Sequence, residues 1–323
     1  MKKAYAGIDI GGSHVKFGLC HLDGSIIHSD KADVGIGGGR DVLLGQVIDC
    51  AKRLLELSSE AGFTLESVGI GTPGIVDHNT GCVIGMSPNL PGWEGTEIKK
   101  EVEAAIDIEV CVDNDVNVMT LAEVVFGAAR GYRHVIATTV GTGVGGGIVI
   151  DGKLYRGSIG GAGEFGHITV VKDGEICGCG KRGCLEAYAS ATALLREAHA
   201  LSNDTGNKSR LSKRFANGGE ITVGDIFRLA ENDGDRDAGN LVDQAADYLA
   251  VGLSSIISVL NPEVVIVGGG MADAGGDYYM NLVEKHLESR TISSHFEHLK
   301  LRRAALGNRA GFVGAGILKD FGY

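Results

Sequence analysis

The sequence predicts an α/β fold divided into two lobes, and three observations support this expectation. Apolar β-type runs alternate with segments whose apolar residues recur at helical spacing, which is the pattern of layered α/β domains. The 52 glycines are concentrated in turns between the β-type runs rather than in a low-complexity tract. A chain of 323 residues is also long enough for two domains, each with its own core.

The first third of the chain starts with three β-type runs joined by tight turns. Residues 4–10 have the pattern of a buried strand, Gly11-Gly12 leads into a second run at 15–22, and Asp23-Gly24 is a hairpin turn into the third. The next expected elements alternate between helix and strand: a helix over 42–55, strands at 67–71 and 108–112, and a helix over 116–126. This alternation predicts an α/β lobe.

A second glycine-rich hairpin repeats the layout of the first. A strand at 134–140, the turn Gly141-Thr142-Gly143 and a returning strand at 145–150 follow the same order. The repeat indicates an internal duplication in layout rather than in sequence identity. The later expected elements are helices over 189–201, 223–231 and 235–260, a strand at 264–267, and a last helix from about 310.

Charge and composition exclude several classes of function. A formal net charge of −11 argues against a general nucleic-acid or anionic-membrane surface, which needs clustered lysine and arginine. No apolar run approaches the roughly 20 residues that span a bilayer, and the start of the chain lacks the layout of a signal peptide. We therefore expect a cytoplasmic protein with small-molecule partners. Four scattered cysteines are expected to be reduced core thiols: Cys20, Cys50, Cys82 and Cys111.

One histidine and three cysteines have the spacing of a zinc site. His167 ends the stretch Gly163-Glu-Phe-Gly-His167, and Cys177, Cys179 and Cys184 follow within a glycine-rich loop. One ring nitrogen and three thiolates complete the tetrahedral set that structural zinc prefers, and the glycines let a short loop turn its sulfurs inward. A chance cluster of buried free cysteines is the alternative, which the scarcity of cysteine elsewhere disfavours.

Two carboxylates, Glu164 and Glu186, flank the predicted zinc ligands. A site with four protein ligands leaves zinc no position for water. We therefore expect the metal to shape the wall of a pocket while the two acids bind a polar ligand.

Two glycine turns have the layout of phosphate-binding loops. The run 141–146 formally fits the dinucleotide fingerprint, but it leads into a β-type run rather than the helix that the fingerprint requires. What remains is a turn whose successive N–H groups can hold phosphate oxygens. The first turn, Asp9-Ile-Gly-Gly-Ser13, adds a carboxylate able to hold magnesium, often through water. Each alone is often a plain tight turn, but together with Gly268-Gly269-Gly270 they predict a nucleotide site.

Asn114 and Asp115 are expected where a strand ends and a helix begins. Either residue type is a common helix N-cap, which explains one of the two at most. The other would lie at the carboxyl edge of a sheet, where α/β proteins bind ligands and where a carboxylate can accept a proton from a substrate hydroxyl. The rigid loop Ser87–Trp93, which includes Asn89, is expected to line the same site.

Taken together, these motifs resemble the ROK family of repressors and sugar kinases over essentially the whole chain. The turns at 9–13 and 141–143 resemble its phosphate motifs, and 163–186 resembles its zinc signature, most closely that of the bacterial glucokinase branch. The resemblance implies a two-lobed actin-like ATPase fold, of the ribonuclease H-like or hexokinase type, with a zinc-binding loop. It also implies ATP, Mg²⁺ and Zn²⁺ as cofactors, a hexose phosphorylated at its 6-hydroxyl, and a homo-oligomer, either a dimer or a tetramer.

The same resemblance implies roles for individual residues. Asp115 would be the general base, and His167 would bind both zinc and sugar. The implied sugar-binding residues are Asn89, Asn114, Asp115, Glu164, His167 and Glu186. The implied nucleotide-binding residues are Asp9, Gly11, Gly12, Ser13, Thr142, Gly143, Gly268, Gly269 and Gly270.

The lobes are expected to join at two points along the chain. The small lobe would comprise residues 1–117 and 308–323, and the large lobe 118–307. Because the implied sugar groups come from both sides of residue 117, a bound sugar is expected to favour lobe closure.

The sequence departs from the family pattern at one motif and leaves alternatives for function. Ser13-His14 replaces the usual Thr followed by Lys or Arg, which keeps the hydroxyl. The first strand starts so close to Met1 that no N-terminal DNA-binding domain is expected. Open alternatives are a kinase of N-acetylglucosamine, N-acetylmannosamine, allose or fructose, a non-catalytic sugar sensor and, less favoured, a filament protein.

Overall fold

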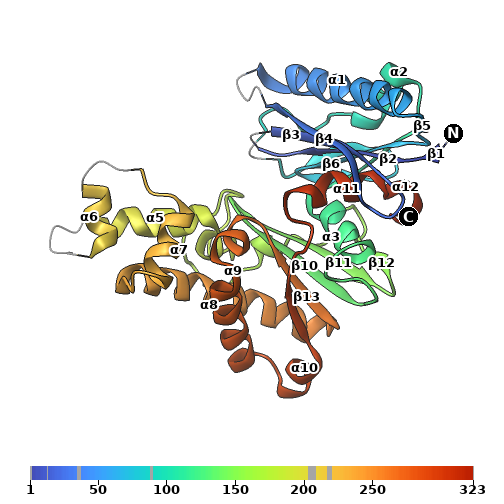
Figure 1. Ribbon diagram of the computed structural model, residues 1–323. Coiled ribbons are helices and arrows are strands. Elements are labelled where there is room, and N and C mark those ends of the chain that lie inside the picture. The colour runs from blue at the N-terminus through green and yellow to red at the C-terminus, as the bar shows by residue number, and fades with distance from the viewer. Residues whose placement is uncertain are drawn as a thin grey trace. The chain divides into compact units, whose positions relative to one another are not determined.

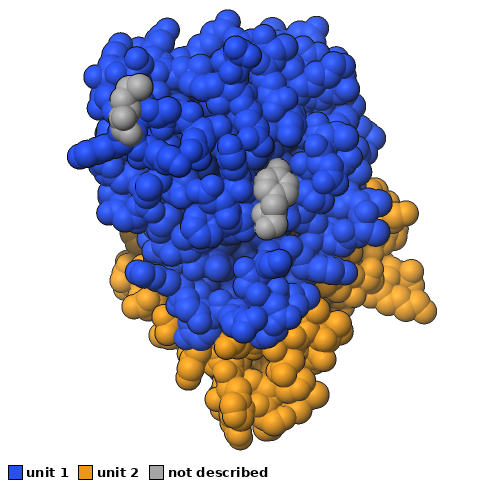
Figure 2. Space-filling model, turned by 90° about the vertical axis from the view of Figure 1, so that its right-hand side faces the viewer, with its two compact units in different colours: residues 1–135, 147–163, 305–323 blue, residues 136–146, 164–304 orange. Residues whose placement is uncertain are grey.

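The computed structural model describes residues 2–12, 14–34, 38–87, 90–202, 209–216 and 220–322. The chain divides into two compact units, which Figure 2 colours separately. Unit 1 comprises residues 1–135, 147–163 and 305–323, and unit 2 comprises residues 136–146 and 164–304. The lobe boundaries expected at residues 117 and 308 stay a prediction. In this division helix α3 (Asp115–Val125) lies within unit 1, where it packs against α11 (Ala310–Gly316).

Unit 1 is built on a five-stranded mixed sheet with the order β4-β3-β2-β6-β9. The strands are β2 (Tyr5–Ile10), β3 (His14–Cys20), β4 (Ile26–Asp33), β6 (Val68–Thr72) and β9 (Val110–Asn114). The first three pair antiparallel, whereas β2, β6 and β9 run parallel. Parallel strands end at the same edge of a sheet, so the register from Asp9 through Gly71 to Asp113 brings the two predicted acidic motifs to one edge.

Helices cover both faces of this sheet (Figure 1). The long helix α1 (Gly39–Glu60) and α2 (Ile98–Ile106) lie on one face, and α3, α11 and α12 (Leu318–Phe321) lie on the other. Glycines in the strands permit the close approach of α11. A Cβ at Gly7 of β2 or at Gly69 of β6 would collide with a backbone carbonyl of α11. The central strands can therefore be covered only because these positions lack side chains.

Three smaller features complete unit 1. β1 (Lys2–Lys3) pairs in parallel with β5 (Phe63–Thr64), and β7 (Ile75–Asp77) forms a hairpin with β8 (Cys82–Gly85). At the far end of α3, the buried Glu123 accepts hydrogen bonds from the backbone N–H groups of Ala128, Ala305 and Leu306. A buried carboxylate therefore fastens the end of a helix to a segment that follows it by some 180 residues in the sequence.

The second sheet has the order β12-β11-β10-β13-β14. Its strands are β10 (Val135–Val140), β11 (Val144–Ile150), β12 (Lys153–Leu154), β13 (Val264–Gly268) and β14 (Lys300–Arg303). The helices that follow β12 are α4 (Glu186–Ala189), α5 (Ala191–Ser202), α6 (Arg210–Ala216), α7 (Val223–Glu231), α8 (Arg236–Leu260), α9 (Gly270–Arg290) and α10 (Ser293–His298). Two of these helices begin at side-chain caps of the expected type: Asp235 caps α8, and Thr222 forms a capping box with Asp225 at α7.

The expected α/β architecture is confirmed, and most expected elements are present. The helix expected over 235–260 is α8, and the strand expected at 264–267 is β13. The sequence prediction lacked α9 and β14. Among the described residues, no helix is long and apolar enough to cross a membrane.

Candidate active site

In unit 1, the predicted magnesium carboxylate, Asp9, lies near the end of β2, just before the glycine turn. The N–H of Gly11 donates to the carbonyl of His14 at 2.9 Å and closes the turn, while Gly12 has no neighbour close to where a Cβ would lie. Ser13 lies outside the described residues. Asp9 is half-buried, and Gly311 at the start of α11 lies so close to its carboxylate that a Cβ there would collide with it.

Burial raises the pKa of Asp9 to about 6, although the nearby Lys16 ammonium lowers it in part. Removal from water disfavours the ionised form of a carboxyl group. A bound divalent cation would favour that form instead. Asp9 offers a half-buried carboxylate, which is a ligand type that magnesium takes in proteins.

At the end of β9, the side chains of Asn114 and Asp115 make different contacts. Asn114 is the N-cap of α3, because its Oδ1 accepts from the N–H groups of Val116 at 2.8 Å and Asn117 at 3.2 Å. Its amide nitrogen donates to the carbonyl of Gly74 at 3.0 Å. Asp115 is the first residue of α3 and half-buried, and its Oδ1 accepts from the N–H of Val116 at 3.0 Å. The cap is thus Asn114, and Asn89 lies outside the described residues.

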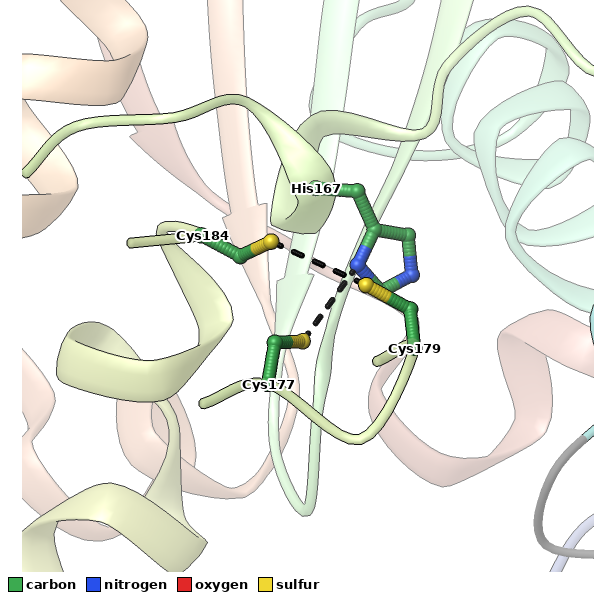
Figure 3. Close-up of side chains that lie close together, drawn as sticks. All are labelled: His167, Cys177, Cys179 and Cys184. Atoms are coloured by element: carbon green, nitrogen blue, oxygen red, sulfur yellow. Dashed lines mark hydrogen bonds between the residues drawn. The ribbon is translucent and has the colours of Figure 1, made fainter. Parts of the chain in front are cut away.

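In unit 2, His167, Cys177, Cys179 and Cys184 converge as the sequence predicts (Figure 3). Their ligand atoms all lie within 4.8 Å of one another. The Sγ atoms of Cys179 and Cys184 are 3.7 Å apart, and Nδ1 of His167 is 3.6 Å from Sγ of Cys177. Tetrahedral zinc with bonds of about 2.3 Å to sulfur and about 2.0–2.1 Å to nitrogen requires separations of about 3.8 and 3.5 Å. The donor set therefore fits one zinc ion.

The local backbone explains why so short a loop can gather these ligands. His167 lies on the 3-10 turn Phe165–His167, and Cys184 lies two residues before the start of α4, separated from it by the N-cap Leu185. Gly183 has a φ of +78°, and a Cβ there would collide with the carbonyl of Val171. Glycine is therefore required next to Cys184 by both conformation and space.

Each of the two flanking carboxylates lies close to one of the predicted zinc ligands. Oε2 of Glu164 is 3.7 Å from Nε2 of His167, and burial is the main cause that raises the pKa of Glu164 above its usual value. Glu186 has one oxygen 3.4 Å from Sγ of Cys177, and its other oxygen accepts from the N–H of Val144 at 3.0 Å. Glu186 therefore connects the cysteine cluster to the turn between β10 and β11, a link that the sequence did not reveal.

That turn and the glycines after β13 lie side by side in unit 2. Gly141 donates to the carbonyl of Gly143 at 2.9 Å, and Thr142 is exposed at the tip. Gly269 has a φ of +87°, and a Cβ there would lie 2.7 Å from the carbonyl oxygen of Val140. Gly270 begins α9, and nothing lies within 4 Å of where its Cβ would be. The exposed tip of this turn lies beside the N-terminus of α9, and an open helix N-terminus fits a phosphate group.

Sequence reasoning missed a buried ion pair next to the predicted base. Arg156 Nη2 lies 2.6 Å from Oδ2 of Asp113, and the two residues are 8% and 1% exposed. Asp113 could have been noticed in the sequence, because it is a charged residue directly after the apolar run that precedes Asn114. Nothing local identified Arg156 as its partner, because 43 residues separate them.

The comparisons with known proteins all indicate one family, and the matches cover nearly the whole chain. A family model described as "ROK family" matches residues 5–320. A glucokinase of Halalkalibacterium halodurans is 34% identical over 97% of this chain and 94% of its own length, and one of Thermotoga maritima is 35% identical over 97% and 96%. Among solved structures, a ROK family glucokinase from Streptomyces griseus, in complex with glucose and AMPPNP, matches with a TM-score of 0.84 and 34% identity over 98% of both chains.

Proposed function

Since this chain belongs to the ROK family, we propose that it is an ATP-dependent kinase that phosphorylates glucose at the 6-hydroxyl. The observation that carries the proposal is the match over 98% of the chain to a glucokinase in complex with glucose and AMPPNP. The α/β fold with mixed sheets agrees with the actin-like ATPase class. Phosphoryl transfer depends on positioning and charge neutralisation, which glycine turns and a few carboxylates can supply.

Asp115 is the general base in this proposal. It accepts the proton of the 6-hydroxyl as that oxygen bonds to the γ-phosphorus, and ADP leaves with the electrons of the broken P–O bond. Its position at the start of α3 supports the assignment, because the positive end of a helix favours an ionised carboxylate. Asn114 and Asn89 are assigned to the sugar hydroxyls beside it.

The nucleotide is assigned to three glycine turns and one carboxylate. Asp9 holds magnesium, directly or through water, which neutralises charge on the phosphates. Backbone N–H groups and hydroxyls of the turns bind the phosphate oxygens. The residues assigned to this role are Gly11, Gly12, Ser13, Thr142, Gly143, Gly268, Gly269 and Gly270.

Unit 2 is also assigned sugar-binding groups and one structural zinc ion. Glu164, His167 and Glu186, all half-buried, bind sugar hydroxyls, and polar groups built to bind a hydroxyl reject analogues that lack it. Nδ1 of His167 faces the sulfurs while Nε2 faces Glu164, so one ring can serve both the metal and the sugar site. Zinc supplies shape rather than chemistry here, because four protein ligands leave no position for water.

A coupled assay of ADP release over a panel of hexoses tests the proposal. The panel comprises glucose, N-acetylglucosamine, N-acetylmannosamine, allose and fructose. The highest kcat/KM is expected with glucose. A higher value with another sugar of the panel would transfer the proposal to that sugar. Sugar binding without ADP release from any of them would instead identify a sugar sensor and contradict the kinase proposal.

A homo-oligomer, either a dimer or a tetramer, remains part of the proposal. Light scattering of the purified protein measures its mass directly. A mass of one chain, 33.6 kDa, at assay concentration would contradict it.

A further inference from the structure

The buried pair of Asp113 and Arg156 lies directly beside the proposed base. The guanidinium Nε donates to Oδ2 of Asp113 at 2.8 Å, and Nη2 lies 2.6 Å from the same oxygen. Buried ion pairs add little to stability compared with well-packed apolar residues of the same volume. Stability alone therefore does not account for a charged pair at this position.

The other oxygen of Asp113 binds the first turn of α3. Oδ1 accepts from the N–H of Asn114 at 2.7 Å and from Nδ2 of Asn117 at 2.9 Å. Asp115 lies between these two residues, so both bonds fix the backbone from which its carboxylate extends. The orientation of the Asp115 carboxylate consequently depends on the position of the Asp113 side chain.

Arg156 is itself held on a closely packed loop of the same unit. Its carbonyl accepts from the N–H of Ala162 at 3.1 Å, and the N–H of Tyr155 before it donates to the carbonyl of Ile148 at 2.8 Å. Further along the loop, Gly160 has a φ of +82°, and a Cβ there would collide with the carbonyl of Val76 in β7. The backbone that carries the guanidinium is thus held by contacts that do not involve α3.

We propose that Arg156 is a positioning residue for the general base. Through Asp113 it fixes the turn 113–117, so that the Asp115 carboxylate keeps its alignment to the sugar hydroxyl, and Arg156 itself touches neither substrate. The inference rests on the proposed kinase function, which gives Asp115 its role. A misplacement of about 1 Å at a reacting group can cost about 100-fold in rate, so such anchoring has a measurable effect.

Two variants separate positioning from simple stabilisation. Arg156→Lys keeps the buried charge paired but loses the planar fork of the guanidinium. The double variant Asp113→Asn/Arg156→Gln removes both charges together, which avoids an unpaired buried charge, and the Asn amide oxygen can still accept from Asn114 and Asn117. In both, kcat is expected to fall about 10- to 100-fold while KM for ATP changes less than about twofold.

A matched control and a second readout complete the test. Arg133→Gln removes an exposed arginine that lies 3.3 Å from Asp151 in the same unit, and it should leave kcat unchanged. Amide hydrogen exchange over residues 113–117 should accelerate in the Arg156 variants and not in the control. This exchange readout does not depend on the substrate being a hexose.

The outcomes distinguish this inference from the proposed function. Folded Arg156 variants with unchanged exchange at 113–117, or with normal kcat, overturn the positioning role. An unaltered protein that phosphorylates no hexose overturns the proposed function, while faster exchange at 113–117 in the variants still supports the anchoring of this turn.

Discussion

At the scale of single residues, the two neighbours at the end of β9 have different surroundings. The Asn114 side chain is bound by two helix N–H groups and by the carbonyl of Gly74. Asp115 begins the helix and presents a half-buried carboxylate at its positive end. The difference supports Asp115, rather than Asn114, as the group that exchanges a proton.

Replacing Asp115 by Asn tests this division. Asp115→Asn keeps size and polarity but removes the base, so kcat should fall about 100-fold or more. Sugar affinity, measured by calorimetry, should survive. Asp151→Asn is a suitable control, because Asp151 is exposed and has a φ of +54°, which Asn tolerates. Near-normal turnover of Asp115→Asn would show that the base lies elsewhere.

Asp9 should make folding stability depend on pH in an unusual direction for an acid. Its folded-state pKa of about 6 lies above the ordinary value of 3.8, because burial disfavours the ionised form. Between these values the folded protein binds the proton more tightly than the unfolded chain does. The stability that this carboxyl contributes is therefore present below its ordinary pKa and is lost as pH rises through about 6.

Asp9→Asn should not lose this contribution to folding stability as the pH rises, because Asn does not ionise. Measured without magnesium, the melting temperature of the variant relative to the unaltered protein should rise between about pH 4 and pH 6 and then stay level. Activity should fall sharply at every pH, since the magnesium carboxylate is gone. A melting difference that does not change with pH would show that the buried carboxyl is not responsible.

At the scale of elements, the loop that carries the cysteines has two kinds of neighbour. It lies beside His167 and Glu186, which the proposal assigns to the sugar, and Glu186 also accepts from the N–H of Val144, directly after the glycine turn. That turn has further support, because the Thr192 hydroxyl donates to the carbonyl of Thr142 at 2.7 Å. Loss of the metal should therefore weaken sugar binding more than nucleotide binding.

Cys179→Ser measures this directly. Elemental analysis of the unaltered protein should give about one zinc per chain, and the variant should lose it. The dissociation constant for the preferred hexose should rise by a larger factor than that for ATP. Cys82→Ser, at a half-buried free cysteine of β8, should keep both zinc and sugar binding. Equal sugar affinity with and without zinc would contradict a supporting role for the loop.

At the scale of the whole molecule, features set by residues close together in the sequence could be predicted from it. Contacts between residues far apart in the sequence could not. The cysteine cluster could be predicted because its spacing and its glycines constrain the loop locally. The pairing of Asp113 with Arg156 and the burial of Glu123 could not be predicted. A single acidic residue within a strand or helix pattern does not indicate which distant residue it will contact. Helix α9 was missed because Gly270, Gly275 and Gly276 interrupt the helical pattern in its first two turns, and Gly276 has non-helical dihedral angles.

The packing of α11 on the central strands determines when each unit can fold as the chain leaves the ribosome. Strand β2 is synthesised early, but α11, the helix that packs on β2 at Gly7, is synthesised after every residue of unit 2. Unit 2, which lies almost entirely within one continuous stretch, should therefore acquire protection before unit 1. A chain ending at Ala304 should be cut by a dilute protease within residues 90–135 faster than the full chain is, while residues 220–304 should resist equally in both. Early protection of residues 1–135 in the shortened chain would mean that the first unit matures without its closing helix.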